Sequence, residues 1–225
     1  MKLLDLFCGA GGAAAGYQAA GFDVVGVDLE PQPEYPGEFH QGDALEWAAE
    51  YDLAVFDAIH ASPPCQGYTP MSNRWGSKQP RVIRQVVRYL DRYPEQPWVL
   101  ENVRGSGLGE LGYVIELTGE QFGLPVHRPR KFLTRWLCLA PPPVPRQPDP
   151  IAVYGKPDGR RLWTRTDGTV HRAWNSAAEG AAALGITHIT DWHGIREAIP
   201  PAYTEYIGRQ LRTAVENGED PRLPR

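Results

Sequence analysis

A glycine-rich turn between two short apolar runs restricts the fold of this chain more than any other feature. Residues 2–7 read KLLDLF, residues 8–21 read CGAGGAAAGYQAAG, and residues 22–28 read FDVVGVD. Apolar and β-branched runs favour strands, whereas the glycines and alanines between them favour a tight turn followed by a helix. The order of these segments predicts a βαβ unit, in which a helix connects two parallel strands.

The same alternation continues beyond this unit. Residues 42–51 have a helical pattern, residues 53–61 are interpreted as a buried strand, residues 80–92 as a helix and residues 97–103 as another strand. Strands that alternate with helices are typical of a mostly parallel sheet whose faces are covered by helices. We therefore expect an α/β fold of the Rossmann-like class, built as one catalytic unit with a small insertion.

The helix expected at residues 80–92 separates apolar from basic side chains. Its apolar face comprises Val82, Ile83, Val86, Val87 and Leu90, and the opposite face carries Arg81, Arg84, Arg88 and Arg92. Such a helix packs one face on the core and leaves the other in solvent. We interpret the arginines as a solvated face, with contact to phosphates as the alternative.

Composition and charge narrow the class of protein. The 225 residues contain no apolar run near the roughly 18 residues of a membrane span, and the first residues lack the pattern of a signal peptide, so we expect a cytoplasmic protein without a membrane partner. Residues 1–60 hold 1 basic and 11 acidic residues, which leaves 22 basic and 16 acidic residues in 61–225. The net charge of −4 therefore conceals a basic region that is compatible with nucleic acid.

The cysteines do not form a recognisable framework. Cys8, Cys65 and Cys138 are widely separated and odd in number, which argues against paired disulfides and against a zinc site. We expect no metal, and we interpret Cys8 and Cys138 as structural residues. Cys65 is different, because it lies between rigid prolines and a glycine at the end of an apolar run.

The character of the sequence changes after the expected catalytic domain of residues 1–136. Residues 140–150 are rich in proline, and the Asp-Gly pairs near residues 158–168 are typical of a short hairpin. We expect residues 137–187 to form a small inserted lobe, and residues 188–225 to return to the catalytic domain. Pro200 and Pro201 mark the start of a helix in that returning segment.

The glycine turn and the acids that follow it predict a ligand site. A turn of this kind lets a ligand approach the backbone, and an acid at the end of the next strand can bind ribose hydroxyls. Here the acid is Asp28, and Asp43 follows it. The G-x-G-x-x-G spacing and the lysine of a phosphate loop are both missing. A nucleoside cofactor fits these residues, with close helix packing on the glycines as the alternative.

Three motifs appear in a characteristic order. They are DLFCGAGG at residues 5–12, PPCQ at residues 63–66 and ENV at residues 101–103. Arg128-Pro129-Arg130 and the segment EAIPPAYTEYIG at residues 197–208 extend the pattern. This order resembles the signature of the cytosine carbon-5 methyltransferases, and the compactness of the chain resembles the family's small phage or prophage members.

The resemblance implies S-adenosylmethionine as the cofactor, bound on a Rossmann-like methyltransferase sheet that carries a small target-recognition lobe. By family position, Asp28 holds the ribose and Asp43 accepts from the adenine amino group. The implied cofactor residues are Phe7, Gly9, Ala10, Gly11, Asp28, Leu29, Asp43, Ala44 and Pro64. Two departures are Leu29, where the family has an aromatic residue, and Glu197-Ala198, where it has Gly-Asn.

The resemblance also implies the catalytic residues Cys65, Glu101, Arg128 and Arg130. A thiolate that attacks carbon 6 of cytosine makes carbon 5 nucleophilic, and a carboxyl group that protonates ring nitrogen 3 stabilises the charge that this attack creates. Cys65 and Glu101 take these roles. Arg128 and Arg130 are expected two residues apart on one strand, on the same side, where they reach the base carbonyl oxygen and a phosphate.

The implied partner is DNA, with the target base flipped out of the duplex. The residues expected to contact DNA are Gln66, Asn102, Arg160, Arg161 and Arg165, with further lobe contacts from Lys156, Arg172, Trp163 and Trp174. A monomer in the cytoplasm of a bacterium or a phage-infected host is expected. A solvated hairpin is the alternative interpretation of the lobe.

Two other functions remain open from the sequence. One is the same chemistry on transfer RNA, although the element that marks this branch of the family is not seen. The other is a catalytically silent module that binds cofactor or DNA. The presence of both Cys65 and Glu101 argues against the silent module.

Overall fold

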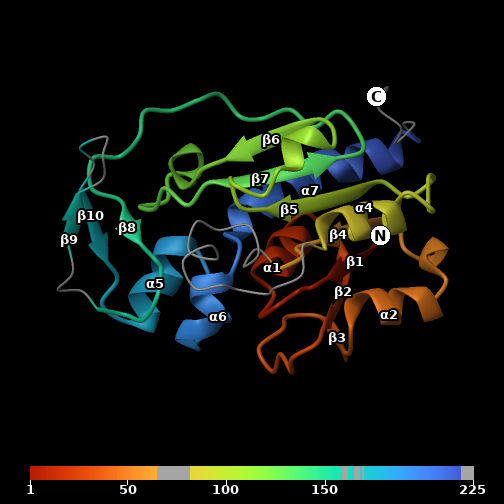
Figure 1. Cartoon of the computed structure of the whole chain (residues 1–225), viewed down its shortest axis with the longest axis horizontal. Coiled ribbons are helices and arrows are strands. Elements are labelled where there is room, and N and C mark those ends of the chain that lie inside the picture. Colours follow the sequence, from red (N-terminus) through yellow and green to blue (C-terminus); the bar gives the residue numbers. More distant parts are fainter. Residues whose placement is uncertain (65–81, 159–161, 165–167, 169, 219–225) are drawn as a thin grey trace.

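The computed structural model describes residues 1–64, 82–158, 162–164, 168 and 170–218. Within them, a seven-stranded sheet has the order β3-β2-β1-β4-β5-β7-β6 (Figure 1). The strands are β1 (Lys2–Leu6), β2 (Asp23–Asp28), β3 (Glu38–Gln41), β4 (Ala58–Ala61), β5 (Trp98–Asn102), β6 (Val114–Leu117) and β7 (Arg130–Thr134). The pairs among β1 to β5 are parallel, and β7 runs antiparallel to both β5 and β6. The predicted Rossmann-like, mostly parallel sheet is confirmed.

Helices cover both faces of this sheet. One face packs against α1 (Gly12–Ala19) and α7 (Pro201–Glu216), and the other packs against α2 (Ala44–Glu50) and α4 (Ile83–Leu90). Neighbouring residues of a strand point to opposite faces, so Leu3 joins the first core and Leu4 joins the second. This double burial explains why the strand sequences are continuous apolar runs instead of alternating ones.

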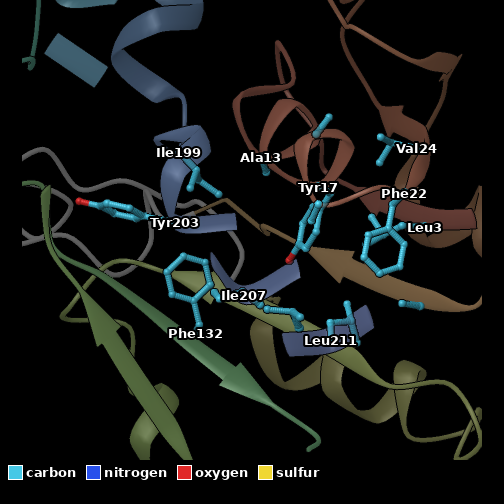
Figure 2. Packing of buried hydrophobic residues seen from close by; sticks show 14 of the residues in the cluster. Leu3, Ala13, Tyr17, Phe22, Val24, Phe132, Ile199, Tyr203, Ile207 and Leu211 are labelled. Atoms are coloured by element: carbon cyan, nitrogen blue, oxygen red, sulfur yellow. The ribbon is translucent and has the colours of Figure 1, made fainter. Parts of the chain in front are cut away.

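The core beneath α1 and α7 is dominated by aromatic and branched side chains (Figure 2). Tyr17, Phe132, Tyr203, Ile207 and Leu211 are fully buried there. Each such side chain contributes roughly 1.5–3 kcal/mol relative to an exposed one. The C-terminal helix is therefore an integral part of the main sheet's core, although it is distant from α1 in sequence.

Close helix packing requires a glycine in α1. A Cβ atom on Gly16 would lie 2.1 Å from the backbone oxygen of Pro201, at the start of α7. The expectation that a helix follows the two prolines is confirmed, because α7 begins at Pro201. Proline suits this position because its missing N–H has no acceptor in the first turn of a helix.

The amphipathic helix expected at residues 80–92 is α4 in its described part, with Ile83, Val86 and Leu90 buried.

The strand expected at residues 53–61 begins later than predicted. The Asp52 side chain accepts a hydrogen bond from the Ala54 backbone N–H at 3.0 Å, which stabilises a short 3₁₀ turn, Leu53–Val55, so that only Ala58–Ala61 forms β4. Two further 3₁₀ turns are Leu108–Glu110 and Gly119–Phe122.

A second group of elements lies at one end of the molecule, beside the main sheet (Figure 1). It contains β8 (Ile151–Ala152), β9 (Leu162–Thr164), β10 (Val170–Ala173), α5 (Ala177–Leu184) and α6 (Trp192–Glu197). β9 and β10 are antiparallel, so the predicted hairpin is confirmed. Trp174 and Ile195 share one core with Val126, which precedes β7. The division of the chain at residues 136 and 187 stays a prediction.

No helix in the described part of the chain is long and apolar enough to cross a membrane.

Candidate active site

The glycine turn follows β1 at the carboxyl edge of the sheet. Phe7, Gly9 and Gly11 all have positive φ, at 59°, 49° and 85°. A Cβ atom on Gly9 would meet no atom within 4 Å, whereas one on Gly11 would lie 2.3 Å from the Pro36 side chain. The turn therefore has one side packed on protein and another side, at Gly9, where a ligand can approach the backbone.

Asp28 is held against this turn. It ends β2, and its carboxylate accepts from the backbone N–H of Gly9 at 2.9 Å and from that of Glu30 at 3.1 Å. The next residue, Leu29, is 63% exposed. These contacts orient the carboxylate before any ligand arrives.

Asp43 lies beside Asp28, because the backbone N–H of Gly42 donates to the Asp28 carbonyl at 2.9 Å. Asp43 caps α2, and one oxygen, Oδ1, accepts from both Leu45 and Glu46. Neither capping bond uses Oδ2. The following residue, Ala44, is buried and anchors the helix start.

The strand order aligns the candidate residues in a row. The carboxyl ends of adjacent parallel strands lie along one edge, and ligands of α/β sheets bind at such an edge where the strand order reverses. Here the reversal falls between β1 and β4. Asp43 follows β3, Asp28 is the last residue of β2, and the glycine turn follows β1. Pro63 follows β4, and Glu101 is the penultimate residue of β5.

The C-terminal part of the chain closes over the turn. His188 Nε2 lies 3.2 Å from the backbone oxygen of Ala10, and a Cβ atom on Gly12 would lie 2.5 Å from the Ile199 oxygen. The Glu34 carboxylate accepts from the backbone N–H groups of Thr190 and Asp191 at 2.9 and 3.3 Å. Sequence reasoning did not single out these two anchors, His188 and Glu34.

Glu101 is a buried acid paired with Arg130. The residue is 6% exposed, and Arg130 Nε lies 3.0 Å from its Oε1. This contact is an ion pair without the alignment of a hydrogen bond, so Oε1 receives no hydrogen bond from the described residues. Burial raises the pKa of Glu101, against the lowering effects of Arg130, Arg128 and a hydrogen bond from Ser62. A proton is thus retained to a higher pH than on an ordinary glutamate.

The expectation that Arg128 and Arg130 share one strand is wrong. Arg130 begins β7, but Arg128 precedes it with a φ of 34°, and the Arg128 side chain is 3% exposed. Its guanidinium donates to the backbone oxygens of Ala198 at 2.7 and 3.0 Å, Arg196 at 2.7 Å and Val153 at 3.2 Å. The side chain is therefore turned toward the C-terminal segment, while Arg130 faces Glu101.

Asn102 supports the backbone ahead of Cys65. The side chain is 1% exposed, its Nδ2 donates to the Pro63 oxygen at 2.8 Å, and its Oδ1 accepts from Val103 N–H at 3.0 Å. The expected contact of Asn102 with substrate is not supported by this geometry, because the amide is buried and bonded to protein. Pro64 is exposed at the same edge.

A second buried polar group was missed from the sequence. His60 is fully buried in β4, its Nδ1 lies 2.9 Å from the Tyr17 hydroxyl, and its Nε2 lies 2.8 Å from Ser62 Oγ. The signal was available, because a histidine within the apolar run AIHA is unusual for a strand buried on both faces.

The remaining candidates divide between buried and undescribed positions. Cys8 and Cys138 are buried, and burial raises the pKa of the Cys138 thiol to about 12 and that of Cys8 still further, as fits structural residues. Trp174 is fully buried in the core of the lobe, which corrects its expected DNA contact. Arg172 is paired with Glu179 at 2.6 Å. The candidates outside the described residues are Cys65, Gln66, Arg160, Arg161 and Arg165.

No cluster of three or more His, Cys, Asp or Glu side chains suited to a metal ion occurs among the described residues.

The family of the chain follows from its similarity to known proteins. The family described as C-5 cytosine-specific DNA methylase matches residues 1–134. This chain belongs to that family. The match includes the glycine turn, both acids, Glu101 and the Arg128–Arg130 element.

Curated relatives of this chain are similar over part of their length. The chain is 27% identical over 150 residues to DNA (cytosine-5)-methyltransferase 1A of Oryza sativa, which covers 57% of this chain and 10% of the relative. It is 25% identical over 166 residues to the type II methyltransferase M.AgeI of Thalassovita gelatinovora, covering 59% and 39%. The chain thus spans well under half the length of these two relatives.

Solved structures share the fold over nearly the whole chain. A putative DNA modification methyltransferase from an E. coli prophage gives a TM-score of 0.58 at 17% identity, covering 96% of this chain and 99% of the other. The S. pombe Dnmt2 methyltransferase gives 0.62 at 15% identity, with 96% and 99% covered. These likenesses confirm the Rossmann-like methyltransferase architecture.

Proposed function

We propose that this chain transfers a methyl group from S-adenosylmethionine to carbon 5 of cytosine in DNA, through a covalent adduct with Cys65 on a flipped base. The observation that carries the proposal is the pairing of buried Glu101 with Arg130 at the end of β5, beside the strand that leads to Cys65. A buried acid with a raised pKa suits a proton donor.

The residues at the ends of β1 to β3 fit the cofactor. Gly9 leaves open space above its backbone, Asp28 presents an oriented carboxylate, and Asp43 Oδ2 is not used by the helix cap. We assign Asp28 to the ribose hydroxyls and Asp43 to the adenine amino group, with Phe7, Ala10, Gly11, Leu29, Ala44 and Pro64 around them. When bound, S-adenosylmethionine supplies an electrophilic methyl group.

The residues after β4 and on β5 carry out the proposed chemistry. The Cys65 thiolate attacks carbon 6 of cytosine as the Glu101 proton moves to ring nitrogen 3, and carbon 5 becomes nucleophilic and takes the methyl group. After the transfer, which leaves S-adenosylhomocysteine, water takes the proton from carbon 5, the thiolate is expelled and the proton on ring nitrogen 3 returns to Glu101. Arg130 holds Glu101 and is assigned to the base carbonyl oxygen, while Arg128 acts as a positioning residue that ties the C-terminal segment to β7.

Methyl transfer to nucleic acid tests the proposal. Labelled S-adenosylmethionine is incubated with the chain and cytosine-containing duplex DNA, and with transfer RNA in parallel. We expect label in DNA at carbon 5, no turnover by Cys65→Ser, and a loss of about 10² to 10⁴ in rate for Glu101→Gln. Cofactor binding by calorimetry should persist in both variants, because neither side chain is assigned to the cofactor.

Other outcomes would select the alternatives. Label confined to transfer RNA would favour the RNA substrate. Cofactor or DNA binding without any transfer would favour a silent binding module. Turnover by Cys65→Ser near the wild-type rate would remove the covalent step from the proposal.

A further inference from the structure

A chain of hydrogen bonds runs from the middle of the core to Glu101. Tyr17 lies on α1, His60 on β4 and Ser62 directly after β4, and the contacts are 2.9 Å from the Tyr17 hydroxyl to His60 Nδ1 and 2.8 Å from Nε2 to Ser62 Oγ. Ser62 and Glu101 each lie one residue beyond Ala61 and Leu100, the last paired residues of the adjacent strands β4 and β5, and the Ser62 side chain lowers the pKa of the Glu101 carboxyl group as a hydrogen-bond donor. Four side chains from α1, β4, the residues after β4 and β5 are thus connected.

The direction of the bonds follows from proton counting. His60 is fully buried, and burial lowers its pKa to about 3, so the ring is neutral and has one donor and one acceptor nitrogen. Ser62 has a single hydroxyl proton. When that proton is donated to ionised Glu101, His60 Nε2 must be the donor to Oγ and Nδ1 must accept from Tyr17. Each bond in the chain then requires the next.

We propose that Ser62, oriented by His60 and Tyr17, is a positioning residue that holds the Glu101 carboxyl group and tunes its proton affinity for methyl transfer. This inference rests on the proposed function. Arg130 contacts Oε1 of Glu101, and the charge of Arg128 acts on the same carboxyl group from the side of β7. Ser62 acts from β4, and Tyr17, with a raised pKa, stays neutral beneath it.

In the proposed reaction, Glu101 must regain its proton after each turnover. Burial alone favours the protonated form, and a donor that stabilises the carboxylate opposes this effect. The two opposing influences keep the acid between permanent protonation and permanent ionisation. Ser62 makes this adjustment without adding a charge, and its hydroxyl is fixed because the His60 ring cannot rotate without losing both of its bonds.

Substitution of Ser62 should change the pKa of Glu101 in a defined direction. Ser62→Ala removes a donor to the carboxylate, so the pKa of Glu101 should rise by about one unit, the difference between a charged and a neutral hydrogen bond. Because the protonated acid is the active form, the alkaline fall in the rate should move to higher pH by the same amount. Ser62→Thr keeps the hydroxyl and should restore the wild-type profile. Tyr17→Phe should shift the profile in the same direction as Ser62→Ala.

The experiment measures Glu101 directly and through activity. The Glu101 carboxyl carbon is titrated by ¹³C NMR in the full chain without nucleic acid, with its signal assigned by Glu101→Gln, and the pH profile of methyl transfer is recorded in parallel. Ser106→Ala is the matched control, because Ser106 is also buried and its hydroxyl has no partner among the described residues. Thermal unfolding of every variant confirms that it is folded.

The two measurements separate the inference from the proposed function. Absence of methyl transfer by the wild-type chain would refute the function, while the NMR titration would still report the Ser62 effect. A Glu101 pKa that differs from wild type by less than about 0.3 unit in Ser62→Ala, or that moves equally in Ser106→Ala, would overturn the positioning role. A raised pKa restored by Ser62→Thr supports it.

Discussion

Replacement of Arg128 by lysine should destabilise the fold more than it alters the chemistry. The guanidinium is the donor to three backbone oxygens, those of Val153, Arg196 and Ala198, which belong to the lobe and to the C-terminal segment. Lysine keeps the charge and can reach one of these oxygens. Two buried carbonyl groups then lose their partner, at about 1–3 kcal/mol each.

The free energy of unfolding should fall by about 3 kcal/mol in Arg128→Lys. This value is near the lower end of that sum, because the shorter side chain leaves room for water. For a chain of this size, about 2–4 °C in Tm corresponds to 1 kcal/mol, so thermal unfolding should shift down by roughly 6–12 °C. Differential scanning calorimetry measures the shift. The matched control is Arg212→Lys, at an exposed pair with Glu216 at 2.8 Å, which should change stability by less than about 0.5 kcal/mol.

The opposite result would return Arg128 to a catalytic role. If Arg128→Lys melts within about 2 °C of the control while methyl transfer is abolished at saturating cofactor, the guanidinium acts on the reacting base and not on the C-terminal segment. A large loss of Tm with transfer retained below the melting temperature supports the positioning role.

Three further changes test the cofactor site, the core and the lobe. Asp28→Asn should weaken S-adenosylmethionine binding by about 10- to 150-fold in calorimetry, the value of a charge-assisted hydrogen bond, and an unchanged Kd would count against the assigned pocket. Burial raises the pKa of Asp5 to about 8, so ionisation of this carboxyl group should lower the free energy of unfolding by about 2 kcal/mol as the pH rises from about 6.5 to 8. Denaturant melts of Asp5→Asn should lack this dependence of the free energy of unfolding on pH. Parallel plots of that free energy against pH for the variant and the wild type would refute the prediction. Arg160→Ala with Arg161→Ala should lower DNA affinity and its salt dependence without altering cofactor affinity, and unchanged binding across a salt series would exclude both arginines from the interface.

The sequence by itself determined the alternation of strands and helices along the chain and the mostly parallel sheet that they form. Apolar runs separated by a glycine turn can bury both faces of a strand only in a helix-covered parallel sheet, and Asp28 and Asp43 necessarily follow its adjacent strands. These features depend on local pattern and on topology. They were therefore predictable without any coordinate.

Only the tertiary structure decided which partners the polar side chains around Glu101 bind. The Arg-Pro-Arg spacing suggested two arginines on one face, but a positive φ at Arg128 turns its guanidinium toward the oxygens of Ala198 and Arg196, some 70 residues away. Likewise, His60 and Tyr17 meet only because α1 packs across β4. A buried hydrogen-bonding group takes whichever partner the fold brings within about 3 Å, and the sequence separation of the two residues carries no information about that distance.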